Sequence, residues 1–252
     1  MHDLEVQLYL ILSYSVILYG ARSWLSTIMN KEKRKQADRL YLLLAALFIA
    51  ALVTCNLIAN KFISIDLGFK TFIISAGILP YPITFLITDI LSEIYGRKKT
   101  NAVVLSGLAA SLFVLLIIYL GGSFDSIADS PVGNDAYNQV FGNSWRVISA
   151  SMIAYLFAQL IDIRIYHFWK KLTKGEFLWL RNNGSTVLSQ LVDTTLVVLV
   201  LFYGVKPNDE LFQFIIDGWM FKALLALLDT PLLYAAVYSI RKYFGIKGHE
   251  EI

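Results

Sequence analysis

The stretch LITDILSEIYG, residues 86–96, places two carboxylates, Asp89 and Glu93, one helical turn apart at the end of an otherwise apolar run. Residues at this spacing share one face of a helix. If the run crosses a bilayer, each ionised side chain at its centre costs about 2.5–3.5 kcal/mol on insertion scales, so it faces protein or water and marks a functional site. Asp89 would lie about 9 Å from the nearer helix end. Glu93 lies one turn closer to water. It could equally be a functional residue or an ordinary residue of the membrane–water interface beside Arg97.

Polar residues of the same kinds recur on other apolar segments, again on shared helix faces. AQLIDIR and SQLVDTT each set an amide three residues before a carboxylate, and FKALLALLDTP sets a lysine seven residues before an aspartate. Because lipid-facing placement of all these charges would cost on the order of 10 kcal/mol, they predict one polar cavity inside a helical bundle. Scattered structural ion pairs are the alternative. The residues are Gln159 and Asp162, Gln190 and Asp193, Lys222 and Asp229 (the pair that best fits the alternative), and Asn56 with Asn60.

The composition is that of a membrane protein. Of the 252 residues 57% are hydrophobic and 16% are charged, and the mean hydropathy is +0.60. A soluble domain carries about a quarter charged residues. The chain has one cysteine, Cys55, so an internal disulfide framework is excluded. Windows of about 20 apolar residues, enough for one crossing, predict transmembrane helices at 5–28, 40–60, 72–95, 101–121, 145–169, 185–204 and 212–240.

Lysine and arginine are distributed unevenly over the connections between these helices. Every second connection and the C-terminal tail are basic, whereas the connections between them hold only Lys61, Lys70 and Lys206, and the longest, 122–144, is acidic. Basic connections remain in the cytoplasm, which predicts an external N-terminus and a cytoplasmic C-terminus. The segment KFISIDLGFKTF fits a small external hairpin or an ordinary loop equally well. The basic groups lie within 31–39, 97–99, 170–181 and 241–247.

Sequence motifs of the common enzyme chemistries are missing. The chain contains no G-x-x-x-x-G-K-[ST], G-x-S-x-G, H-E-x-x-H or C-x-x-C pattern, so we expect no ATP hydrolysis by a phosphate loop, no cofactor and no metal. His2 and His249 lie in the tails and His167 lies near a helix end. An intramembrane enzyme is therefore the less favoured reading, nucleic acid is not an expected partner, and a scaffold protein would not need buried ions.

Five segments in order resemble the queuosine precursor transporters, a vitamin-uptake-like family formerly described as a domain of unknown function. They span residues 40 to about 240: NLIANKFISI, ILPYPITFLITDILSEIYGRKKT, SMIAYLFAQLIDIRIYHFWKKLT, LWLRNNGSTVLSQLVDTTL and FKALLALLDTP. The resemblance implies a six-helix core similar to the substrate-binding subunits of energy-coupling-factor importers, here with one extra N-terminal helix. It implies roles in substrate binding or coupling for Asn56, Asn60, Asp89, Glu93, Gln159, Asp162, Asn182, Gln190, Asp193, Lys222 and Asp229.

The function implied is import of 7-deazaguanine bases, such as 7-cyano-7-deazaguanine, for salvage into the tRNA nucleoside queuosine. A carboxylate can accept the N1–H and the amine of such a base together, an amide or lysine can donate to its O6, and aromatic rings can stack on it. The donors would be Gln159, Gln190, Asn56 or Lys222, and the rings Tyr81, Phe85, Tyr155 and Phe157.

The sequence thus predicts an all-α, polytopic membrane bundle, with an N-terminal helix and loop at 1–39, a transporter core at 40–245 and a tail at 246–252. We expect it in the bacterial cytoplasmic (inner) membrane. Its partners would be a purine-like small molecule and the lipid bilayer, and a homo-oligomer is compatible with this prediction. Uptake would be facilitated or proton-coupled. The alternative is an importer of another small heterocycle, a vitamin or nucleobase, working with a partner ATPase.

Overall fold

The computed structural model describes residues 31–59, 61–66, 68, 71–142, 144–202, 207–246 and 250–251. Contacts divide the chain into two units, Met1–Leu43 and Leu44–Ile252. Of the first unit, residues 31–43 are described and are helical. The remaining description concerns the second unit. The predicted first span, 5–28, lies outside the described residues, as does Asn60.

Within the described part of the chain, five helices are long and apolar enough to cross a membrane. A further helix, α5 (Ser144–Leu172), has 29 residues and is also long enough. The predicted all-α, polytopic membrane fold is therefore confirmed for these residues. The five are Lys31–Leu57, Ala76–Ile94, Gly96–Gly122, Leu178–Val200 and Asn208–Phe244.

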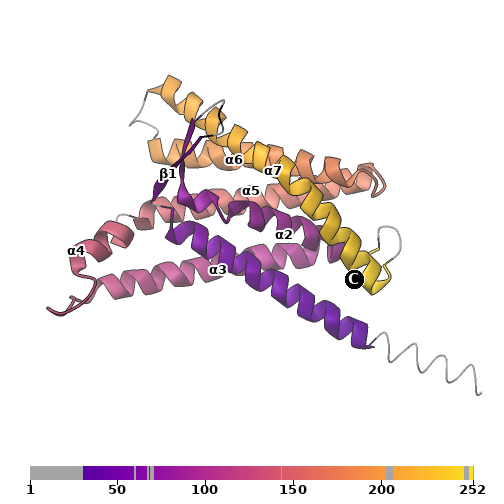
Figure 1. Cartoon of the computed structure of the whole chain (residues 1–252), viewed down its shortest axis with the longest axis horizontal. Coiled ribbons are helices and arrows are strands. Elements are labelled where there is room, and N and C mark those ends of the chain that lie inside the picture. The colour runs from indigo at the N-terminus through magenta and orange to yellow at the C-terminus, as the bar shows by residue number, and fades with distance from the viewer. Residues whose placement is uncertain are drawn as a thin grey trace, which may run out of the picture. The chain divides into compact units, whose positions relative to one another are not determined.

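One short helix, α2 (Tyr81–Ile94), lies at the centre of the second unit. It contacts α3 (Gly96–Gly122), α5 and α7 (Asn208–Phe244), while α6 (Leu178–Phe202) packs between α5 and α7. Figure 1 shows α5, α6 and α7 side by side. Nearly every residue of α2 from Thr84 onward is buried, whereas α3 exposes a row of large apolar side chains suited to lipid. The polar side chains of α2 thus face protein.

A two-stranded hairpin precedes α2. Strand β1 (Phe62–Asp66) pairs antiparallel with β2 (Thr71–Ser75), so the hairpin alternative was the correct one. Gly68 lies in the turn with φ +80°, a conformation that glycine adopts without strain, and its N–H donates to Asp66 Oδ1 at 2.9 Å. The helix predicted from residue 72 is wrong at its start: β-branched residues of β2 favour an extended chain, and a 3₁₀ turn (Ala76–Ile78) follows before α2.

The connection between α3 and α5 holds helix α4 (Asn134–Tyr137) and a π-helical turn, η2 (Asn138–Gly142). At the other end of the chain, α7 runs for 37 residues through Pro231 and ends at Gly245, which has φ +70°. At 1.5 Å per residue, α7 is roughly 55 Å long. It therefore supplies side chains to both ends of the bundle.

The first prediction concerns Gly77, where the 3₁₀ turn approaches the helix Lys31–Leu57 and the residues after it. A Cβ atom at Gly77 would lie 2.5 Å from the backbone oxygen of Cys55 and 3.3 Å from Cα of Ala59. Since backbone must move, we expect Gly77→Ala to destabilise the protein by about 1–3 kcal/mol, measured as a lower apparent melting temperature in detergent. Gly133→Ala is the control, because nothing lies within 4 Å of its added Cβ. Equal melting temperatures would contradict this packing.

Candidate functional site

A partly open pocket of about 630 Å³ lies between the hairpin, the segment Leu52–Ala59 and the neighbouring parts of α2, α5, α6 and α7. Its volume is within the usual range for small-molecule sites, about 300–1,000 Å³. Most of its surface is apolar, with a few polar groups among aromatic side chains. The polar side chains that line it are Asn56, Thr71, Ser75, Tyr81, Tyr155, Asp193, Asp217 and Lys222.

Asp193 on α6 is the polar centre of this pocket. Its Oδ2 accepts a hydrogen bond from the Tyr81 hydroxyl at 2.7 Å and pairs with Lys222 Nζ at 2.6 Å. The Lys222 ammonium also lies 4.5 Å from the centre of the Tyr81 ring. Three helices thereby fix one carboxylate through one of its oxygens, and within the described residues Oδ1 keeps its capacity to accept from a ligand.

Aromatic side chains form one wall of the pocket. Tyr81 lies 5.6 Å from Tyr155 between ring centres, and Phe85 packs behind both rings. Three of the four aromatic residues expected near a flat ligand are therefore clustered. Phe157 is 55% exposed and does not line the pocket.

A second layer of polar side chains lies deeper in the bundle. Asp89 is about 12 Å from Tyr81 along α2, at 1.5 Å per residue. Gln159, which donates to the Tyr155 hydroxyl at 2.7 Å, links this layer to the pocket, and Ser189 donates to Asp162 Oδ1 at 3.0 Å. All are fully buried, and several oxygens and nitrogens lack a partner among the described residues. We call this the middle layer: Asp89, Gln159, Asp162, Ser189 and Gln190.

Neither aspartate of the middle layer forms an ion pair with a described residue. Asp89 Oδ1 and Asp162 Oδ2 are buried without a hydrogen-bond partner. An isolated carboxylate is strongly disfavoured in such surroundings unless it is protonated or compensated, so this layer is suited to holding a proton.

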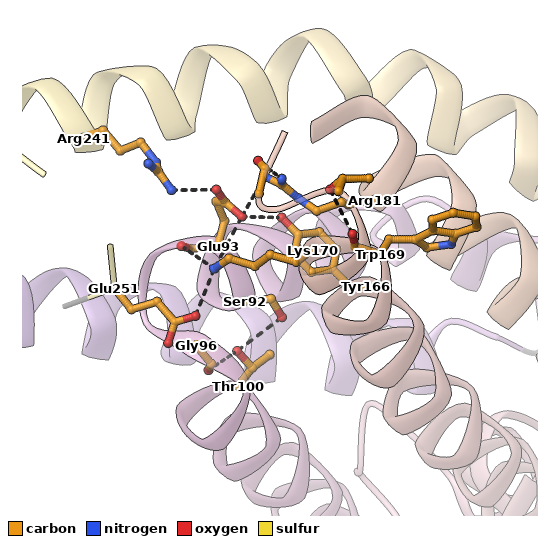
Figure 2. A network of polar contacts seen from close by, with 12 residues as sticks. Ser92, Glu93, Gly96, Thr100, Tyr166, Trp169, Lys170, Arg181, Arg241 and Glu251 are labelled. Atoms are coloured by element: carbon orange, nitrogen blue, oxygen red, sulfur yellow. Dashed lines mark hydrogen bonds and ion pairs between the residues drawn. The ribbon is translucent and has the colours of Figure 1, made fainter. Parts of the chain in front are cut away.

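Glu93 is the anion of a buried ion cluster at the far end of α2. Arg241 Nη2 lies 2.6 Å from its Oε1, and Arg181 Nη2 lies 2.9 Å from its Oε2. Tyr166 donates to Oε2 at 3.0 Å, and Lys170 Nζ is 3.7 Å away. Figure 2 shows these side chains converging on Glu93 from α5, α6 and α7. We call this set the Glu93 cluster: Glu93, Tyr166, Lys170, Arg181 and Arg241.

The backbone between α5 and α6 holds Arg181 in place. Its Nη1 donates to the carbonyls of Gly175 and Glu176, in a loop where Lys174 and Phe177 both have positive φ. Lys170 also pairs with Glu251 at 2.9 Å (Figure 2). Arg181 and Lys170 therefore each have a second anchor besides Glu93.

The structure divides the predicted site residues into these three layers. The pocket contains Asn56, Asp193 and Lys222. The other predicted residues of α2, α5 and α6 lie outside it, so one cavity shared by all of them stays a prediction. Lys222 pairs with Asp193 on α6 and not with Asp229, the partner expected along its own helix. Asp229 is partly buried, and Asn182 is buried beside Arg181 on α6.

Glu93 is also placed differently from the interfacial alternative. It is 1% exposed and its cations are Arg181, Arg241 and Lys170, while Arg97 is exposed. The physical reason is that α2 is covered by α5, α6 and α7 at this level, so a carboxylate there is removed from water and needs cations from those helices.

Sequence reasoning missed four residues that the geometry brings forward. Asp217 lines the pocket, and no helical spacing relates it to Lys222, since residues five apart do not share a helix face. Lys170, Arg181 and Arg241 were counted only as flanking positive charges. No spacing rule within one helix could have found their shared partner. Among the described residues, no group of three or more His, Cys, Asp and Glu side chains is arranged to hold a metal ion.

Apolar membrane-crossing helices around a small-molecule pocket, with buried polar side chains behind it, define a membrane transporter. The chain belongs to the family whose model is described as "Putative vitamin uptake transporter", which matches residues 75–236. It is 32% identical over 161 residues to the "Probable queuosine precursor transporter" of Bacillus subtilis (strain 168), covering 64% of this chain and 70% of that protein. It is 25% identical over 226 residues to the "Queuosine precursor transporter" of Escherichia coli (strain K12), covering 84% and 92%. No solved structure matches the chain.

The second prediction tests the pairing of Asp193 with Lys222. Removing one charge leaves the other unpaired at a partly buried site, whereas removing both does not. In a double-mutant cycle of Asp193→Asn and Lys222→Met, we expect a coupling energy of about 0.5–3 kcal/mol, from thermal unfolding in detergent. The matched cycle of Lys222→Met with Asp229→Asn is the control and should be additive. Coupling in the control cycle alone would show that the pairing is the intrahelical one.

Proposed function

We propose that the protein imports queuosine precursors, 7-deazaguanine bases such as 7-cyano-7-deazaguanine, for salvage into modified tRNA. Two relatives that carry the queuosine precursor transporter name match most of the chain. The observation that carries the proposal is Asp193, a carboxylate fixed by Tyr81 and Lys222 inside a pocket of ligand size. We place it in the bacterial cytoplasmic membrane.

The pocket offers the chemistry that such a base needs. Oδ1 of Asp193 would accept from the N1–H or from the exocyclic amine, a charge-assisted hydrogen bond. Asn56 Nδ2, which is buried without a hydrogen-bond partner among the described residues, or Lys222 would donate to O6. Tyr81 and Tyr155 would stack on the ring, and such stacking contributes about 1–3 kcal/mol per base.

The orientation that we propose for the protein in the membrane rests on the charges at the two ends of the bundle. Lys170, Arg181 and Arg241 lie at the Glu93 end, opposite the pocket. Cytoplasmic ends of membrane helices are the ones enriched in Lys and Arg. We therefore propose that the pocket faces the outside, that the Glu93 cluster faces the cytoplasm, and that the C-terminus is cytoplasmic.

The third prediction is that Asp193→Asn lowers uptake of labelled precursor by at least about tenfold. A hydrogen bond to a charged group contributes about 1.5–3 kcal/mol, and 1.4 kcal/mol is a factor of ten. The assay is uptake into cells unable to make the precursor, scored also by queuosine in tRNA. Asp209→Asn, an exposed aspartate at the start of α7, is the control at matched membrane abundance.

The same assay separates the substrate classes. Unlabelled deazaguanine bases should compete with the label, and vitamins should not. Competition by a vitamin alone, or dependence on an added ATPase, would favour the second candidate, import of another heterocycle, which the family description supports. Unchanged uptake by Asp193→Asn would contradict the proposed binding mode.

For the energy source we propose proton coupling through Asp89 and Asp162 in preference to facilitated diffusion. Asp89 Oδ1 and Asp162 Oδ2 are buried without a partner among the described residues, and a proton neutralises such a group most simply. If these carboxyls are buried only when they are protonated, the conformation that buries them takes up a proton. Movement of the bundle is then coupled to the proton gradient. Glu93 and Asp193, by contrast, each have a cation within ion-pair distance.

The fourth prediction is that Asp89→Asn keeps exchange of labelled for unlabelled base but loses accumulation driven by a pH gradient in proteoliposomes. The amide preserves the shape of the side chain and removes its titration. A protonophore should abolish accumulation by the parent protein and leave exchange intact. Accumulation that resists the protonophore would assign uptake to another energy source.

A further inference from the structure

The polar residues of four helices lie in the same order from one end of the bundle to the other. On α2 the order is Tyr81, Asp89, Glu93, and on α5 it is Tyr155, Asp162 and Lys170; α6 and α7 run the same course from Asp193 to Arg181 and from Lys222 to Arg241. From Tyr81 to Glu93, the rise is roughly 18 Å along α2. The pocket, the middle layer and the Glu93 cluster therefore form one polar column.

We propose that the Glu93 cluster is the closed inner gate of this column, and that Glu93 must part from Arg181, Arg241 and Lys170 to release substrate. The inference rests on the proposed transport function but names residues and a step beyond it. It gives Lys170, Arg181 and Arg241, which lie outside the pocket, a place in the transport cycle. Glu93 then holds the gate closed and does not contact the substrate.

The contacts join the helices that would have to separate. Glu93 on α2 is bonded to Arg241 on α7, to Arg181 on α6 and to Tyr166 and Lys170 on α5. Four of the helices that contribute a polar group to the pocket, α2, α5, α6 and α7, thus also contribute one to the cluster. No described residue outside these helices pairs with Glu93, so loss of this one carboxylate removes the link among all four.

The energetics suit a gate better than a permanent joint. Burying an ion pair removes hydration that the pair recovers when water enters, so the closed and open states can be close in free energy. Nε of Arg181 and of Arg241 is buried without a hydrogen-bond partner among the described residues. Once Glu93 withdraws, three cations on three helices repel one another, which favours separation.

The column behind the cluster already carries the groups that water or a ligand would meet. Asp89 Oδ1, Asp162 Oδ2, Gln159 Oε1 and both polar atoms of the Gln190 amide are buried and lack partners in the described part of the chain. Polar groups in this state are costly and call for hydration or a ligand. Opening the Glu93 cluster would let water or a ligand reach these groups, whereas a permanently closed ion cluster would not.

The test uses two reporter thiols on α6 in a background in which Cys55→Ala removes the native thiol. Ser185→Cys replaces a fully buried serine one turn inside Arg181, and Val197→Cys replaces a valine that lines the pocket. Purified protein in lipid nanodiscs is treated with a small water-soluble thiol reagent. The rate of modification at each position reports whether that end of the column is open, and no substrate is added.

With the cluster intact, we expect the thiol at position 197 to react readily and the thiol at position 185 to be protected. Glu93→Gln should raise the rate at position 185 by at least about tenfold, corresponding to a shift of about 1.4 kcal/mol, and lower the rate at position 197. Arg241→Gln should act in the same direction but less, because Arg181 stays on Glu93. Lys98 is an exposed lysine in the first turn of α3, a few residues after Glu93. Lys98→Gln should change neither rate.

Opposite changes at the two positions support the gate. A rise at both positions would indicate general loosening around a structural ion cluster and overturn the proposal, as would unchanged rates in both Glu93→Gln and Arg241→Gln. Because the assay contains no substrate, its outcome does not depend on which base the protein carries. Suppose that the cells take up no deazaguanine base, but that the two thiols change their reaction rates in opposite directions. The substrate assignment would then be overturned and the gate would be kept.

Discussion

Removing a carboxylate from water is strongly unfavourable in a helical bundle surrounded by lipid, and the arrangement of α2, α5, α6 and α7 follows from compensating several of them. Glu93 is compensated by cations from three neighbouring helices, and Asp193 by one lysine and a phenol. Between them, Asp89 and Asp162 have no described cation. The carboxylates at the two ends of the bundle are therefore paired with cations, and the two carboxyls in the middle are not.

Much of the fold could be predicted from the sequence because lipid imposes simple rules. Long apolar windows located the helices, and the alternation of apolar residues around Asp66 and Gly68 made the hairpin that borders the pocket one of two alternatives. The prediction extended the third span too far, since Thr71 to Ser75 are apolar enough to resemble a helix but are paired as a strand. Apolar content alone does not distinguish a buried strand from the first turns of a helix.

The candidate site was predicted in its residues but only partly in its arrangement. Periodicity fixes which side chains share a face of one helix, so Lys222 was associated with Asp229. It does not fix how neighbouring helices are rotated or shifted, and those two quantities place Asp193 against Lys222 and Glu93 against Arg241. The basic residues near helix ends fit the rule for cytoplasmic charge and at the same time serve as partners of a buried anion. The expected likeness of residues 40–245 to energy-coupling-factor subunits stays a prediction.

The length of α7 has a mechanical consequence. It carries Lys222 to the pocket and Arg241 to the Glu93 cluster, with Pro231 between them. Proline supplies no N–H to the carbonyl of Leu227, so bending is easiest at that level of the helix. The half of α7 that follows Pro231 can then tilt while the half that carries Lys222 keeps its position. Such a bend would displace the Arg241 guanidinium relative to Glu93 and leave the pocket unchanged.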